Sequence, residues 1–241
     1  MSRLSPFIGG TRRLVLHAGQ YGLLLGPVRR ALIEPAAAAH DEVLRLLICY
    51  YGERLWAAGL IAGTCGNLSA RLRDHETVYI TPRSANKSRL NAPDIVRVSL
   101  RAGPHSAGRA SVELPMHRAC YLASPNVGAV IHTHAPALTG LGLRDVDIEE
   151  LLPEAANALG KTARIEYAPS GSEKLGGMVA DAVVDGATLI LLERHGAVSV
   201  GHNLAEAYER MELGELTAKA ALLGSDDGRR AAARLTTNRE G

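Results

Sequence analysis

The sequence is poor in aromatic residues, since Phe, Trp and Tyr together make up 4% of its 241 residues, with a single Phe and a single Trp. A core therefore has to be built from Ala, Leu, Val and Ile, which pack densely without a polar tip. Cysteine is also scarce: Cys49, Cys65 and Cys120 are scattered and form no CxxC pair. This argues against a disulfide framework and points to a reducing, cytoplasmic location.

The sequence has almost no net charge, because 27 Lys and Arg residues stand against 25 Asp and Glu residues. A net charge of +2 creates no strong field for a nucleic acid. No segment reaches the roughly 18 consecutive apolar residues that a membrane span requires. We therefore expect a soluble globular protein with neither a nucleic acid nor a membrane as its partner.

We expect one domain over residues 41–223, between an N-terminal extension at 1–40 and a polar tail at 224–241. The extension contains Arg12 and Arg13 before an apolar run, which gives it some likeness to a twin-arginine export signal. Polar residues interrupt that run, and nothing further along the chain demands export. The favoured interpretation is a poorly ordered extension or a helical arm that packs on a neighbouring subunit.

Apolar periodicity and turn residues predict a mixed α/β domain. Helices are expected at 41–58, 114–123, 145–160, 173–184 and 204–223. Strands are expected after a glycine-bearing turn within 63–71, and at 78–81, 95–100, 127–132, 164–167 and 188–192.

Three of the nine histidines lie where a metal site can form. His132 and His134 are two residues apart at the end of a predicted strand, so both imidazoles project to the same face. His195 lies just after another apolar strand. Three neutral nitrogens that leave one coordination position open suit a catalytic Zn²⁺, and also admit Mn²⁺, Fe²⁺ or Co²⁺. Alternatively, one histidine of the pair faces solvent and the other binds a backbone carbonyl.

Glu113 stands directly before the predicted helix at 114–123. A carboxylate in this place is often only a partner of the helix dipole. Beside a metal, it would instead be a ligand or a general base. His117 follows four residues later on the same helix face, where it could orient Glu113, act on a substrate, or simply be a buried structural residue.

Four blocks of this sequence together resemble the class II aldolase/adducin family, whose best-known type is L-fuculose-1-phosphate aldolase. The blocks are Gly63-Thr64-Cys65-Gly66-Asn67-Leu68-Ser69, Ile80-Thr81-Pro82, Glu113-Leu114-Pro115-Met116-His117 running through Tyr121 to His132-Thr133-His134, and His195-Gly196 with Gly201, Leu204, Glu206 and Ala207. They cover about residues 41–222 in the correct order. The resemblance implies a three-layer α/β/α sandwich around a mainly antiparallel sheet.

The resemblance also implies a homotetramer with active sites between subunits. Each site would hold a divalent metal, usually zinc, on His132, His134 and His195. Glu113 would serve there both as a metal ligand and as the acid/base group.

Substrate contacts are implied at Asn67, Arg83, Ser84 and Ser111, but this part of the pattern departs from that of sugar-phosphate aldolases. Where those enzymes have a Thr-Gly pair after Ile-Thr-Pro, this chain has Arg83-Ser84, and their second serine before the glutamate is Val112 here. Arg83 could hold a phosphate, although its planar guanidinium fits a carboxylate equally well.

A second departure concerns the acid that protonates a leaving aldehyde oxygen. Aldolases of the family use tyrosines for this step, one of them in the C-terminal tail, whereas this chain has no Tyr after Tyr208. Tyr167 is the nearest remaining candidate.

A metal site of this kind suits a carbon–carbon lyase that works through a stabilised enolate or enediolate. The two departures favour a non-phosphorylated, carboxylate-bearing substrate over a sugar phosphate. The leading hypothesis is decarboxylation of a hydroxylated carboxylic acid, including dihydroxy aromatic acids, with Arg83 on a carboxylate and Glu113 or His117 moving the proton. The first alternative is a class II aldolase that cleaves a ketose 1-phosphate. A non-catalytic adducin-like interaction module is the alternative from another class, and retention of the three histidines and Glu113 argues against it.

Overall fold

The computed structural model of the chain describes residues 41–102, 108–143 and 153–224. The predicted extension at 1–40 and all but the first residue of the predicted tail lie outside the described residues. The same holds for the first half of the helix predicted at 145–160.

A seven-stranded sheet runs through the middle of the described structure, in the order β3-β2-β1-β4-β7-β6-β5. Its strands are β1 (Asn67–Arg71), β2 (Thr77–Ile80), β3 (Val96–Ser99), β4 (Ala129–Thr133), β5 (Lys161–Ile165), β6 (Ala187–Leu192) and β7 (Gly196–Gly201). Neighbouring strands are antiparallel except β5 and β6, which are parallel. The expectation of a mainly antiparallel sheet is confirmed.

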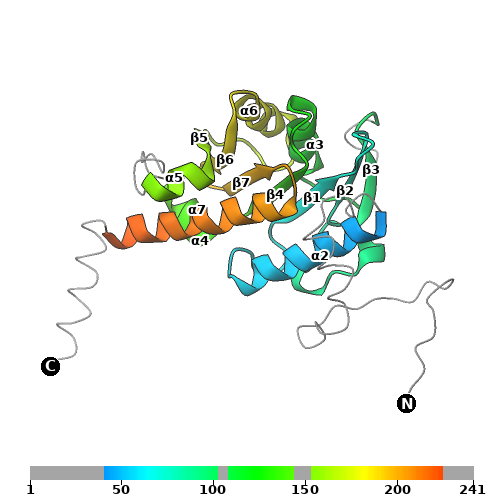
Figure 1. Ribbon diagram of the computed structural model, residues 1–241, viewed down its shortest axis with the longest axis horizontal. Coiled ribbons are helices and arrows are strands. Elements are labelled where there is room, and N and C mark those ends of the chain that lie inside the picture. The colour runs from blue at the N-terminus through cyan, green and yellow to red at the C-terminus, as the bar shows by residue number, and fades with distance from the viewer. Residues whose placement is uncertain (1–40, 103–107, 144–152, 225–241) are drawn as a thin grey trace, which may run out of the picture.

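Helices cover both faces of this sheet (Figure 1). They are α2 (Asp41–Ala57), α3 (Leu114–Ala123), α4 (Pro136–Leu141), α5 (Pro153–Leu159), α6 (Glu173–Val184) and α7 (Leu204–Gly224), with short 3₁₀ helices η2 (Lys87–Arg89) and η3 (Ala92–Asp94). None of these described helices is both long and apolar enough to cross a membrane.

The side chains of β4 show how the layers are held together. Ile131 packs with residues of α2 and α7 in one buried cluster, whereas its neighbour Val130 packs with residues of α3 and α6 in another. Alternate residues of a strand point to opposite faces, so both faces of β4 are apolar because both are covered. The three-layer α/β/α sandwich expected from the resemblance is therefore confirmed.

Two elements beside the candidate site were not predicted from the sequence. Strand β7, Gly-Ala-Val-Ser-Val-Gly, is fully buried between β4 and β6, but its small residues give no long apolar run. Helix α4 has six residues, which is too short for a helical period to show.

Two glycines allow other segments to pass close to the end of β4. A Cβ atom on Gly196 would lie 2.2 Å from the carbonyl oxygen of Thr133, and one on Gly66 would lie 2.8 Å from that of His132. Gly66 also has a φ of +71°, which favours glycine. These close approaches bring His195 and the start of β1 up to the two histidines of β4.

A buried carboxylate fixes the start of α4, directly after His134. Glu215 of α7 is 1% exposed, and it accepts hydrogen bonds from the backbone N–H groups of Ala137, at 3.1 and 3.2 Å, and Leu138, at 2.9 Å. The Nζ atom of Lys219 lies 3.3 Å from the same carboxylate. These hydrogen bonds connect α7 to the N-terminus of α4, which follows the metal-ligand candidates His132 and His134 in the chain.

We expect Glu215→Ala to lower the free energy of unfolding by about 3 kcal/mol, because it leaves two buried N–H groups without an acceptor. Urea unfolding followed by circular dichroism measures the change. Glu209→Ala is the matched control, since Glu209 lies exposed on the same helix and its loss should change stability by less than about 0.5 kcal/mol. Equal effects of the two variants would contradict the anchoring role of Glu215.

Candidate metal centre and active site

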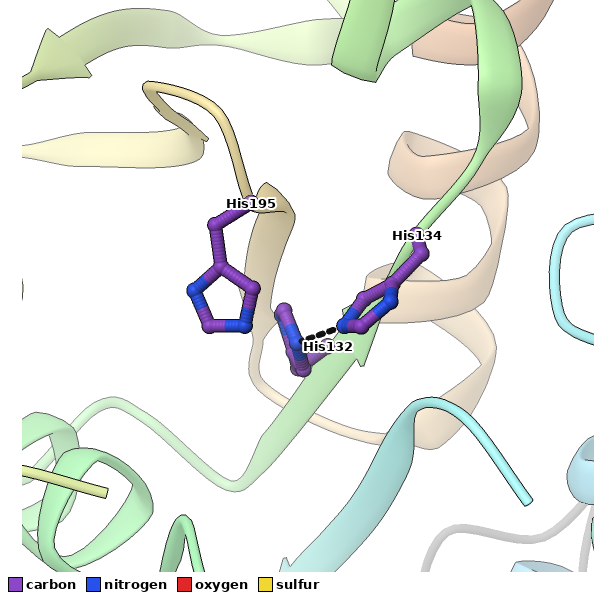
Figure 2. A group of neighbouring side chains, drawn as sticks. All are labelled: His132, His134 and His195. Atoms are coloured by element: carbon purple, nitrogen blue, oxygen red, sulfur yellow. Dashed lines mark hydrogen bonds between the residues drawn. The ribbon is translucent and has the colours of Figure 1, made fainter. Parts of the chain in front are cut away.

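His132, His134 and His195 lie together at the ends of the inner strands β4, β6 and β7, and Figure 2 shows their rings gathered around a common space. One nitrogen from each ring lies within 4.8 Å of the others. The Nε2 atoms of His132 and His134 are 3.1 Å apart. His132 is in β4, His134 follows it, and His195 lies in the turn between β6 and β7. The strand ends thus bring together the three histidines predicted from the sequence.

Glu113 completes this cluster from the N-terminal end of α3. Its Oε2 atom lies 3.1 Å from Nε2 of His132, and its Oε1 atom lies 3.3 Å from Nε2 of His195. The carboxylate is buried, with 3% of the residue exposed. Four groups with ligand atoms of the kind that zinc prefers therefore converge from three parts of the chain.

The protonation of the histidines suits a cation. Nδ1 of His132 donates to the carbonyl oxygen of Ala197 at 3.0 Å, so its Nε2 atom carries the lone pair that faces the cluster. Burial lowers the pKa of His132, and burial followed by the charge of His195 lowers that of His134. Neutral imidazoles backed by a carbonyl group are the usual metal-binding form. The donor set therefore fits a divalent metal.

Two hydrogen bonds hold Glu113 in its ionised form. Asn67 donates from Nδ2 to Oε2, and Ser170 donates from Oγ to Oε1, both at 2.8 Å. Burial alone would raise the pKa of Glu113, but the charge of His132, these two hydrogen bonds and the charge of His195 together lower it. Because His132 is neutral near pH 7, the two hydrogen bonds are the contribution that persists there.

Ser170 was not predicted as a site residue. It lies in the loop before α6, and the neighbouring Gly171 has a φ of +72° and passes so close to Val112 that a Cβ would lie 2.8 Å from the Val112 carbonyl oxygen. The sequence showed only a turn with a serine before a helix. The contact with Glu113 arises from the packing of α6 against α3.

A chain of hydrogen bonds runs behind Asn67 into the protein. Because Asn67 donates to Glu113, its Oδ1 atom must accept, and it does so from Nε2 of His117 at 2.5 Å. Nδ1 of His117 is then an acceptor for the Ser69 hydroxyl at 2.6 Å, and the Tyr121 hydroxyl lies 2.7 Å from that of Ser69. Each group in this chain therefore donates to the next one in the direction of Glu113.

His117 therefore uses both ring nitrogens inside the protein. It is fully buried, and burial lowers its pKa to about 4, so the ring is neutral at pH 7. Of the two roles considered from the sequence, this geometry favours orienting Glu113 through Asn67 over direct action on a substrate.

The other expected substrate contacts divide into two groups. Ser111 joins Glu113, since its Oγ atom accepts from the Glu113 backbone N–H at 3.3 Å. Arg83 and Ser84 are exposed, and Ser84 has a φ of +53°. Both line a cleft of about 500 Å³. Neither Glu113 nor any of the three histidines lines this cleft. Its lining residues are Pro82, Arg83, Ser84, Ala85, Asn86, Arg89, Leu90, Asp94, Gly108 and Arg109.

Tyr167 lies near one side of the cluster. The guanidinium of Arg194 lies 4.9 Å from the centre of the Tyr167 ring, and Arg194 directly precedes His195. Tyr167 is 49% exposed. The tyrosine singled out from the sequence is thus close to the turn that carries a metal-ligand candidate.

Comparison with known proteins finds a match to a family model. Residues 47–222 match the model for the class II aldolase and adducin N-terminal domain. L-Fuculose phosphate aldolase of Methanococcus vannielii is 36% identical over 159 residues, covering 66% of this chain and 84% of that protein. The 3-oxo-tetronate 4-phosphate decarboxylase of Haemophilus influenzae is 30% identical over 184 residues, covering 74% of this chain and 87% of that protein.

Solved structures give the same result. YgbL of Klebsiella pneumoniae, a candidate aldolase, epimerase or decarboxylase, superposes with a TM-score of 0.71 at 30% identity, covering 77% of this chain and 92% of that one. L-Fuculose-1-phosphate aldolase of Thermus thermophilus has a TM-score of 0.64 at 30% identity and covers 74% and 92% of the two chains.

The buried His117 makes stability depend on pH. Its pKa of about 4 in the folded protein lies below the value of about 6.5 in an unfolded chain, so the unfolded state binds the extra proton between these values. Stability from this residue is complete above pH 6.5 and is lost as the pH falls. We expect a loss of about 2 kcal/mol between pH 7 and pH 5.

Urea unfolding at pH 7 and pH 5, in the presence of a chelator, measures this loss. His117→Gln should remove about 2 kcal/mol of the pH-dependent difference, since glutamine does not titrate. His75→Asn is the control, because His75 is exposed and its φ of +58° is one that asparagine tolerates. An identical pH dependence in wild type and His117→Gln would show that His117 is not held neutral.

Proposed function

Since the chain belongs to the class II aldolase and adducin family, we propose that it is a metal-dependent lyase that decarboxylates a hydroxylated carboxylic acid. Its similarity to a 3-oxo-tetronate 4-phosphate decarboxylase leads us to propose an acid that carries a phosphate group, in place of the non-phosphorylated acid that the sequence departures favour. Its curated relatives include aldolases and a decarboxylase, and the chain is accordingly a lyase. The observation that carries the proposal is the convergence of Glu113 with His132, His134 and His195. A non-catalytic interaction module has no use for these four groups.

Zinc is the metal that we propose, held by the three histidines with Glu113 as a further ligand. When bound, the ion supplies positive charge that stabilises the negative charge developing on substrate oxygens as a carbon–carbon bond breaks. The carbonyl of Ala197, which fixes the tautomer of His132, supports the ligand set from behind.

Glu113 is the group that we propose to carry the proton. Decarboxylation releases carbon dioxide and leaves the bonding electron pair on the carbon next to the carbonyl group, and that carbon then takes up one proton that comes from solvent. Asn67 and Ser170 fix both carboxylate oxygens of Glu113 at 2.8 Å, which orients the group for transfer. His117, Ser69 and Tyr121 hold Asn67 in this orientation.

Three of the described tyrosines are not available as the acid of an aldol cleavage, which supports decarboxylation. An aldol cleavage needs an acid for the leaving oxygen, whereas carbon dioxide leaves without a proton. Within the described residues, the hydroxyls of Tyr79, Tyr121 and Tyr208 are hydrogen-bonded to Asp41, Ser69 and Glu212, respectively. Their side chains are therefore committed to structural contacts.

A class II aldolase acting on a ketose 1-phosphate is the second candidate function. The position of Tyr167 favours it, since this half-exposed tyrosine packs against Arg194, the neighbour of His195. The Methanococcus relatives, which are L-fuculose phosphate aldolases, point the same way.

Assays of the zinc-loaded protein separate these functions. We expect carbon dioxide release from 3-oxo-tetronate 4-phosphate, no aldehyde release from L-fuculose 1-phosphate, and slower or no reaction with dihydroxy aromatic acids. Aldehyde release without carbon dioxide would favour the aldolase. Failure with both classes of substrate, in a protein that binds zinc, would contradict a lyase of either kind.

The metal assignment has its own test. We expect His132→Asn to lower zinc affinity at least 100-fold, because one of the neutral imidazole ligands is removed. Elemental analysis of the purified protein after dialysis measures the bound metal. The control is His202→Asn, since His202 is exposed and pairs with Glu206. Equal metal content in the two variants would rule out the proposed centre.

A further inference from the structure

Lys87 is a buried cation that the sequence analysis did not consider. It lies in η2 and is 2% exposed, although lysine is rarely buried unless it is paired. Its Nζ atom donates to the carbonyl oxygen of Thr64. In the part of the chain that the structure describes, Lys87 forms no ion pair and no second side-chain hydrogen bond. Two of its three N–H groups therefore have no protein acceptor there.

The ammonium of Lys87 lies beside the candidate active site. Thr64 is three residues before Asn67, the residue that donates to Glu113. Burial lowers the pKa of Lys87 to about 8, while the charges of Cys65 and Glu113 oppose this change. The charge of Lys87 in turn contributes to the lowered pKa of His134. Interactions of this kind require proximity.

The carbonyl group that accepts from Lys87 belongs to an exposed loop. Thr64 and its neighbour Cys65 are exposed, and so is His134 of the histidine cluster. Solvent thus reaches both the loop that contacts the ammonium and the metal-ligand candidate whose pKa the charge of Lys87 lowers.

The backbone of Lys87 is held firmly in place. Asn86 accepts hydrogen bonds from the N–H and the hydroxyl of Ser88, at 3.0 and 2.8 Å. On the other side, η2 packs against Gly52 of α2, where a Cβ would lie 2.9 Å from the Lys87 carbonyl oxygen. A cation fixed in this way loses little conformational freedom when it binds an anion.

We propose that Lys87 binds the terminal oxyanion of the substrate, a phosphate or a carboxylate, with the N–H groups that have no protein acceptor. Binding there would direct the opposite end of the substrate to Glu113 and the histidines. A partly desolvated ammonium binds an oxyanion more strongly than an exposed guanidinium does, so Lys87 takes this role in place of Arg83. That this oxyanion belongs to a substrate rests on the proposed function, whereas the binding of an oxyanion by Lys87 does not.

Calorimetric titration of the zinc-loaded protein with inorganic phosphate and, separately, with acetate tests the proposal. Lys87→Met shortens the side chain by one atom and removes its charge, and we expect it to weaken binding of one of the two anions at least tenfold. The anion that is affected identifies the chemistry as phosphate or carboxylate. Lys87→Arg should recover part of the affinity.

Lys174→Met is the matched control, because Lys174 is exposed on α6, and its affinities should stay within twofold of wild type. Lys87→Gln provides a second neutral variant that keeps a donor for the Thr64 carbonyl. The zinc content and the thermal unfolding midpoint of each variant are also measured, because a merely structural role of Lys87 would lower one or both of them. Unchanged affinity for both anions in a folded, zinc-loaded Lys87→Met or Lys87→Gln protein would overturn the proposal.

These titrations are independent of catalysis. If the wild type binds phosphate through Lys87 but cleaves no substrate, the proposed function is wrong and this inference stands. If the enzyme is active, Lys87→Met should raise KM at least tenfold with a smaller change in kcat, because the lost contact is made in the ground state as well as the transition state. Activity with an unchanged KM would contradict the inference alone.

Discussion

The register of β4 is the constraint on which the rest of the site depends. His132 pairs with Asn67 of β1 on one side and with Val198 of β7 on the other. A slip of one residue would turn His132 to the opposite face of the sheet and bring Thr133 in its place. The apolar neighbours fix the register, because Val130 and Ile131 each fill a different buried cluster. Core packing thus determines where the metal ligands point.

This register places Asn67 beside His132, and the hydrogen bonds of the site then form a chain in which each group donates to the next one towards Glu113. The Glu113 carboxylate can only accept, so Asn67 turns its amide nitrogen to Glu113 and its oxygen to His117. That oxygen sets the Nε2–H tautomer of His117 and leaves Nδ1 to accept from Ser69. In a low-dielectric interior each of these groups would be costly without its partner, so the network favours a single arrangement. The result is a carboxylate that is ionised although it is buried, next to His132, whose imidazole is neutral because burial lowers its pKa. That combination is what a divalent cation requires.

The residues that the sequence predicted well are those whose spacing carries the information. His132 and His134 share a face because a strand alternates, and α3 and α6 have the bounds predicted from the sequence. Ser170 and Lys87 were missed because their roles depend on contacts between distant segments. Strand β7 was missed because its small residues are needed for close approach: at Gly196 any side chain would collide with β4. The small residues that allow this close approach therefore also leave β7 without the apolar run by which a strand is predicted.

Burial also decides between cations that look alike in the sequence. A net charge of +2 provides no general attraction for an anionic substrate, so binding must come from single groups near the metal. Arg83 was the natural candidate, but it is exposed in a cleft that it shares with Arg89 and Arg109, where solvent screens its charge. Lys87 has fewer donors, yet its ammonium is shielded from water and electrostatically coupled to Glu113 and His134. The same desolvation that makes this charge costly in the free protein strengthens its attraction for an oxyanion. A buried lysine beside a metal centre therefore has a reason to be there that stability alone does not supply.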